Sequence, residues 1–106
     1  MVLKKAVSNI TEQLNISDFQ LIKIIGINLN EIEQIENSKS FGLALSLIDF
    51  YKELYFIFGD DLKKIKVFLT SYNMLLKGKP LEIIQNESGL DFVVSTLRSL
   101  RIHSFH

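Results

Sequence analysis

The feature that most constrains this fold is how seldom the chain is interrupted, with one proline, Pro80, and five glycines among 106 residues. Proline breaks the interior of a helix and glycine weakens it, so a chain with few of both can stay helical over most of its length. No Ser/Gly-rich or low-complexity stretch marks a linker. A chain of this length fits one domain, which buries roughly 65% of the surface that its unfolded form exposes. We therefore predict a compact all-α fold.

Apolar residues spaced three or four apart predict three helices in the N-terminal part of the chain. The first extends from Leu3 to Leu14. Ser17 is suited to cap the second, which is expected to end at Gly26. An asparagine, Asn28 or Asn30, is suited to cap the third.

A long apolar helix follows. The third helix is expected to end near Asn37, and Gly42 to separate it from a helix that spans Leu43 to Phe58. Apolar side chains cover more of the long helix than one core face requires. It is either a central helix contacted on several sides or one that also presents an aromatic self-association surface. The dimer contacts expected from the second interpretation are Phe50, Tyr51, Leu54 and Tyr55.

Glycine and proline divide the last part of the chain into short elements. Gly59 is expected to end the long helix and Asp60 to cap the next one. Gly78 allows a sharp turn, and Pro80 suits the first turn of a short helix, where its missing N–H leaves nothing unsatisfied. Gly89 is expected to end that short helix before a final amphipathic helix begins.

Charge and composition exclude several classes of protein. Twelve basic and twelve acidic residues balance, which predicts no strong general attraction to nucleic acid or to membranes. The chain has no cysteine, so disulfides and thiolate metal sites are excluded. Neither a signal peptide nor an apolar run of membrane-spanning length is present. We expect a cytoplasmic protein.

Catalytic signatures are missing from the sequence. It contains no serine elbow, Gly-rich phosphate loop or paired-carboxylate cleft, and Asp60-Asp61 is explained as the start of a helix. His103 and His106 lie three apart but lack acidic or thiolate partners, which makes a poor metal site. We therefore expect no enzyme, no metal and no cofactor.

Residues Ile16 to Glu36, ISDFQLIKIIGINLNEIEQIE, resemble the helix-turn-helix of Xre/Cro-type regulators, with Gly26 in the turn. The resemblance implies a helix-turn-helix unit within residues 1–42 that binds operator DNA. Its second helix is acidic, however, with Glu31 and two further glutamates, and this opposes phosphate binding. A retained scaffold or dimer element remains the alternative. The candidate DNA contacts are Lys23, Asn28, Asn30, Gln34 and Lys39.

The rest of the chain carries a more specific series of motifs. They are the FGDD corner of residues 58–61, Phe68-Leu69, Asn73-x-x-Leu76-x-Gly78, Pro80-Leu81-Glu82-Ile83-Ile84, and Gly89 with the helix after it. In this order they resemble the toxin-binding domain of Xre/MbcA/ParS-like antitoxins, which usually has Trp-Leu where this chain has Phe-Leu. The resemblance covers residues 43–102 and implies that residues 43–106 form the toxin-binding region.

The resemblance also implies a function and partners. Antitoxins of this family neutralise a cognate toxin by covering the entrance to its active site. The toxin is usually a RES-type enzyme that degrades NAD and is encoded next to the antitoxin. A homodimer is expected, and operator DNA is a further candidate partner. The alternatives are a DNA-binding transcriptional regulator and an orphan dimeric adaptor of the same fold.

Candidate toxin contacts come from the last helix, the C-terminal tail and the connector before Pro80. The last helix is expected to bury one apolar stripe and to leave Arg98 and Arg101 facing outward. Residues after Leu100 either form part of the binding surface or are a frayed turn that folds back on the core. The candidate toxin contacts are Tyr72, Asn73, Lys77, Arg98, Arg101, Ile102, His103 and Phe105.

Overall fold

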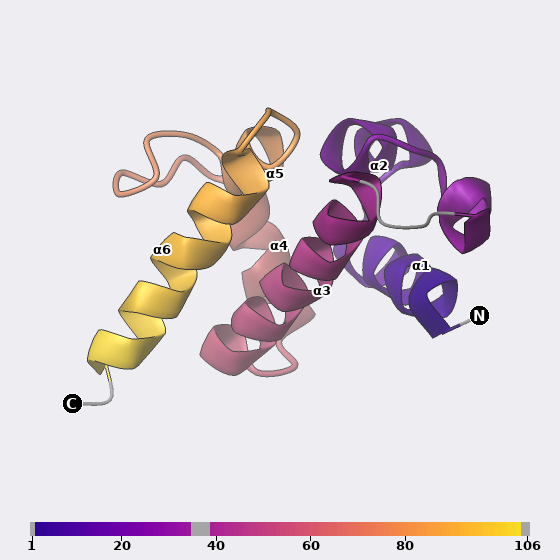
Figure 1. The fold of residues 1–106 in the computed structure, drawn as a ribbon. Coiled ribbons are helices and arrows are strands. Elements are labelled where there is room, and N and C mark those ends of the chain that lie inside the picture. The colour runs from indigo at the N-terminus through magenta and orange to yellow at the C-terminus, as the bar shows by residue number, and fades with distance from the viewer. Residues whose placement is uncertain (1, 35–38, 105–106) are drawn as a thin grey trace.

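The computed structural model describes residues 2–34 and 39–104, and this part of the chain folds into helices, without a strand (Figure 1). The elements are α1 (Val2–Leu14), α2 (Asp18–Ile25), the 3₁₀ helix η1 (Leu29–Gln34), α3 (Lys39–Phe58), α4 (Leu62–Thr70), α5 (Pro80–Ile83) and α6 (Gly89–Ser104). The predicted all-α class is confirmed. None of the helices in the described ranges is long and apolar enough to cross a membrane.

Helix α3 is the centre of the core. It runs through the middle of the molecule, with α6 packed along one side, and it also contacts α1, α2 and α4 (Figure 1). Its Leu47, Phe50 and Leu54 are fully buried, as are Val7 of α1 and Val93 of α6. One hydrophobic cluster therefore joins the N-terminal helices to the C-terminal ones.

Local capping explains where α2 begins and ends. The Ser17 hydroxyl accepts a hydrogen bond from the Gln20 amide, and the Gln20 side chain accepts one from the Ser17 amide. These reciprocal bonds satisfy two amides that a helix start leaves unpaired. Gly26 ends the helix with φ of 88°, a left-handed conformation that glycine adopts without strain. Both predicted boundaries are confirmed.

The third predicted helix differs from the expectation. The residues after Asn28 form η1, a six-residue 3₁₀ helix, and residues 35–38 lie outside the described ranges. Asn28 begins it, because its side-chain oxygen accepts from the Glu31 amide while the Glu31 carboxylate accepts from the Asn28 amide. Leu29 and Ile32 are three apart, so a three-residue turn places both toward the core.

Two predicted boundaries around α3 and α4 are wrong. Gly42 lies inside α3, because the helix starts at Lys39, and an isolated glycine costs a helix only about 1 kcal/mol. Packing of the apolar residues that follow outweighs that cost. Gly59 does end α3, with φ of 67°, but the cap of α4 is Asp61, whose carboxylate accepts from the Lys64 amide at 3.2 Å.

Gly89 has a different role from the one expected. Helix α5 already ends at Ile83, and Gly89 begins α6. A methyl group on Gly89 would overlap the carbonyl oxygen of Ile83 and lie 2.7 Å from its carbonyl carbon. Glycine therefore permits the close approach of α6 to α5 rather than stopping a helix, while Ser88 adopts the positive φ, 64°.

Candidate functional site

The one buried charged side chain among the described residues is Glu53 of α3, which is 6% exposed. Its Oε1 atom accepts from Arg101 Nε at 2.6 Å, and its Oε2 atom accepts from Arg101 Nη2 at 3.2 Å. Arg98 Nε donates to the same Oε2 atom at 3.4 Å. The Arg101 guanidinium also lies 4.7 Å from the ring centre of Phe56. Together these side chains hold the C-terminal half of α6 against α3.

This cluster corrects the expectation for one of two toxin-contact candidates. Arg98 and Arg101 were both expected to face outward; Arg98 does, but the Arg101 side chain is only 26% exposed, and both arginines bind Glu53. The Arg101 hydrogen bond lowers the pKa of Glu53, with burial acting in the opposite direction. Their charge is therefore used within the chain. Arg98 retains an exposed surface, since 46% of its side chain is accessible.

The C-terminal tail continues α6 as far as Ser104. Ile102 is 48% exposed, and the ring nitrogen Nδ1 of His103 lies 2.8 Å from the Ser99 carbonyl oxygen one turn earlier. The described part of the tail therefore extends the helix and does not fold back on the core. Phe105, another candidate contact, lies outside the described residues.

A compact loop forms the connector between α4 and α5, and we call residues 71–79 the connector loop. Asn73 organises it: its amide donates to the Gly78 carbonyl, its carbonyl accepts from the Lys77 amide, and its side-chain oxygen accepts from the Leu76 amide. Lys77 adopts a left-handed φ of 60° to complete the turn. Asn73 and Lys77, expected as contacts, therefore also shape the loop.

This loop geometry separates inward from outward side chains. Leu76 is 5% exposed and packs into the core, whereas Tyr72, Met74 and Leu75 are 65%, 85% and 58% exposed. We call these three outward side chains the connector patch. The sequence indicated Tyr72 but not Met74 or Leu75. No local pattern gives their direction, because it follows from the burial of Leu76 in the folded chain.

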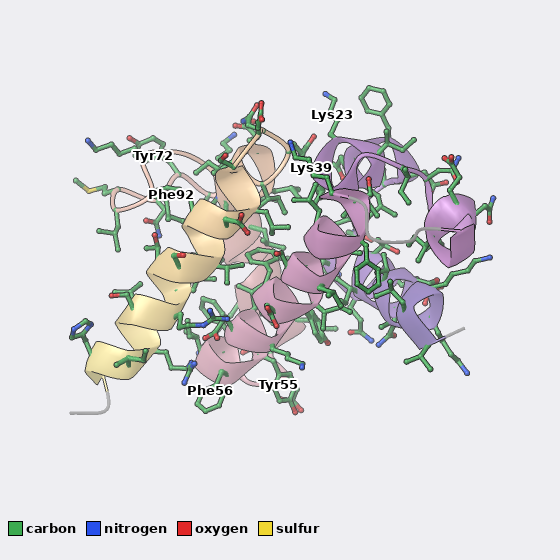
Figure 2. All side chains as sticks on the ribbon, viewed as in Figure 1. Lys23, Lys39, Tyr55, Phe56, Tyr72 and Phe92 are labelled. Atoms are coloured by element: carbon green, nitrogen blue, oxygen red, sulfur yellow. The ribbon has the colours of Figure 1, made fainter. Side chains whose placement is uncertain are left out.

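The connector loop is placed beside the start of α6. A methyl group on Gly78 would lie 3.1 Å from the Ile83 side chain, and Gly89 approaches the backbone of the same isoleucine. Ile83 thus lies between the two segments. Figure 2 shows Tyr72 and Phe92, which is 49% exposed on α6, at the same end of the molecule.

The two candidate lysines for DNA binding lie beside acidic groups. Lys23 of α2 and Lys39 of α3 line a pocket of about 350 Å³ together with Glu87 and Asp91. Lys39 Nζ is 3.4 Å from the Glu87 carboxylate, and Lys23 Nζ lies 4.7 Å from the ring centre of Phe19. The structure therefore brings these two lysines together, but in mixed-charge surroundings.

The other candidate DNA contacts belong to η1. Asn28 caps this 3₁₀ helix with its side chain, and Asn30 is exposed. The side chain of Gln34 lies outside the described part. Among the described residues the element next after Gly26 is the 3₁₀ helix η1, and not the α-helical second half that the resemblance implied.

The candidate dimer contacts divide into two pairs. Phe50 and Leu54 are fully buried in the core, so the expectation that they contact a second copy is wrong. Their side chains lie in the core because other helices pack against α3 on several sides. Tyr51 is half-buried, and Tyr55 is 54% exposed near one end of α3 (Figure 2).

Metal-binding groups are not gathered anywhere in residues 2–34 and 39–104, where no three His, Asp or Glu side chains could hold one ion.

No family model matches the sequence, and no curated protein matches it. We take the connector patch and the exposed end of α6 as the candidate site, because large side chains are exposed there.

Proposed function

We propose that this chain is an antitoxin that neutralises a cognate toxin by direct binding and occlusion of its active site. The partner implied by the resemblance over residues 43–102 is a RES-type enzyme that degrades NAD. Neutralisation of this kind requires shape and charge complementarity, and no catalysis is proposed for the chain itself. A complex of this type is expected to bury on the order of 1,600 Å².

The observation that carries the proposal is the connector patch. Tyr72, Met74 and Leu75 are large, exposed and held on a loop that hydrogen bonds at Asn73 fix in one shape. A loop ordered before binding loses less conformational entropy when it docks. Tyrosine and methionine are enriched at protein interfaces.

We further propose a homodimer in the cytoplasm, where a toxin that consumes NAD would act. The contacts that remain available on α3 are Tyr51 and Tyr55, since tyrosine is enriched at interfaces and Tyr55 is more than half exposed. Two antitoxin surfaces in one particle would allow two toxin molecules to be bound.

DNA-binding autoregulation is the weaker part of the proposal. Asn28 is occupied as a cap, Lys39 is paired with Glu87, and η1 itself carries Glu31. Phosphate attraction supplies much of the affinity for DNA, and these features reduce it. We infer that the N-terminal elements act chiefly as a scaffold for α3.

Co-expression tests the proposal. The chain would be produced together with the RES-type enzyme encoded beside it, and cellular NAD and growth would be measured. We expect the toxin alone to deplete NAD and arrest growth, and the pair to restore both. Persistent NAD depletion at equal expression of the soluble antitoxin would contradict the proposal. A salt-sensitive shift of its own promoter DNA without any rescue would favour a transcriptional regulator instead.

A further inference from the structure

The positive charge of this neutral chain is concentrated in one segment. Residues 62–79, which comprise α4 and the connector loop, contain five of the twelve basic residues and no Asp or Glu. The five are Lys63, Lys64, Lys66, Lys77 and Lys79. All five are exposed, and none takes part in an ion pair among the described residues. This contrasts with Lys39, Arg98 and Arg101, which have carboxylate partners.

Exposed apolar side chains lie within the same segment. On α4, Lys63, Lys66 and Val67 share one helical face, because they are three and four residues apart. Val67 is 63% exposed. Helix α4 leads directly into the connector patch, where Met74 is 85% exposed. The exposed apolar side chains between Val67 and Leu75 therefore lie between two groups of lysines in the chain.

We propose that α4 and the connector loop form the docking surface for the toxin, and that the toxin presents an apolar socket with an acidic rim to them. The inference rests on the proposed antitoxin function and names the chemistry of its partner. The connector patch fills the socket, and the five lysines meet the rim. Attraction between these opposite charges accelerates association and orients the two proteins.

A protein surface fits these side chains better than nucleic acid or a membrane. Single-stranded nucleic acid is held through stacking on aromatic rings, and Tyr72 is the one aromatic side chain of the patch. Met74 and Leu75 require an apolar pocket instead. Membrane-surface helices carry a broad apolar face, whereas the exposed face of α4 carries only Val67 between lysines.

Binding of the full-length chain to the purified RES-type toxin tests the charge component. We expect Lys77→Glu/Lys79→Glu to weaken binding at low ionic strength by about ten-fold or more, because charges become screened beyond roughly 10 Å at 0.1 M salt and the lost attraction is electrostatic. The difference in affinity between this variant and wild type should become smaller as salt is added. The matched control, Lys5→Glu/Lys52→Glu, changes net charge equally at exposed sites outside the segment and should retain binding.

The apolar component has its own pair of variants. Met74→Ser/Leu75→Ser should weaken binding about ten-fold at both low and high salt, as expected for anchor residues. Val2→Ser/Phe19→Ser is the control, since Val2 and Phe19 are 85% and 68% exposed and lie elsewhere. Circular dichroism melts of all four variants identify any loss of folding. Unfolded variants would be replaced by Met74→Gln and Lys77→Gln, which keep the loop's size and backbone.

Each outcome decides a different claim. If folded connector variants bind the toxin as well as wild type, the docking surface is wrong while the antitoxin function stands. If the wild-type chain fails to bind the toxin, both proposals are overturned. If the wild type binds random duplex DNA or phosphatidylserine vesicles more tightly than toxin, and through the same lysines, the assignment to an acidic protein is overturned.

Discussion

Helix α6 is fixed at its two ends by different forces. At its start, Gly89 touches the backbone of Ile83 so closely that no side chain fits. Toward its end, Arg98 and Arg101 bind the buried carboxylate of Glu53. Steric fit does not depend on pH or salt, whereas an ionic contact depends on both. The start of α6 should therefore be an invariant support for the connector loop, and its C-terminal half a contact that solution conditions can weaken.

The steric end predicts the largest effect. Gly89→Ala places a methyl group on the Ile83 backbone, which cannot move away by a side-chain rotation. We expect a loss of about 3 kcal/mol in the free energy of unfolding, at the upper end for overpacked sites. Urea denaturation followed by circular dichroism measures it.

The control for this prediction is Gly42→Ala. Gly42 lies inside α3 with nothing within 4 Å of an added methyl, so alanine should raise stability by about 0.5–1 kcal/mol through better helix propensity. If Gly89→Ala lowers the free energy of unfolding and Gly42→Ala raises it, the packing effect at Gly89 is separated from the effect of helix propensity. Equal stability of both variants would show that α6 can shift away from Ile83 at little cost.

The ionic end predicts a smaller effect. Glu53→Gln keeps the shape of the side chain but removes the charge that Arg98 and Arg101 bind. Because the two arginines are 46% and 26% exposed, water partly replaces the lost partner. We expect a loss of about 2 kcal/mol, as for hydrogen bonds to charged groups. Glu87→Gln should cost about 0.5 kcal/mol or less, because its pair with Lys39 is fully on the surface. A similar cost for both variants would show that burial adds nothing to the Glu53 contact.

The same carboxylate gives a pH dependence whose sign follows from its pKa. Glu53 has a lowered pKa in the folded chain, chiefly because Arg101 donates to the ionised form. Its contribution is therefore complete above the ordinary pKa of about 4.5 and is lost as the pH falls below that value. The stability difference between wild type and Glu53→Gln should shrink in this range, while the difference between wild type and Gly89→Ala stays constant. Denaturation series at several pH values would show whether the two ends separate in this way.

The contrast between the two ends of α6 also shows which contacts could be predicted from the sequence and which could not. The Ser17–Gln20 capping box and the stop at Gly26 involve neighbours in the chain, so local patterns predicted them. The Glu53 contacts join residues 45 and 48 positions apart, and no local pattern reports such a pairing. Arg98 and Arg101 were accordingly both expected to face outward, which holds for Arg98 but not for Arg101.

The candidate site shows the same division. Asn73, Gly78 and Pro80 stood out in the sequence because they shape the backbone of the turn. The outward direction of Met74 and Leu75 depends on the burial of Leu76, which in turn depends on the packing of α4 against α5. The sequence thus located the turn but not the side chains that it exposes.

The smallest expected effect on stability comes from the residues beyond the ionic contact. Deletion of Ile102 to His106 leaves Arg101 and Glu53 in place, and the described side chains that it removes, Ile102 and His103, are exposed, so the helical circular dichroism should change little. Neutralisation of the toxin should still weaken, because Ile102 and His103 extend α6 outward as candidate contacts. Rescue of growth and retention of NAD would be compared for the full and shortened chains at equal expression. Full neutralisation by the shortened chain would remove the tail from the mechanism and leave the docking function to α4 and the connector loop.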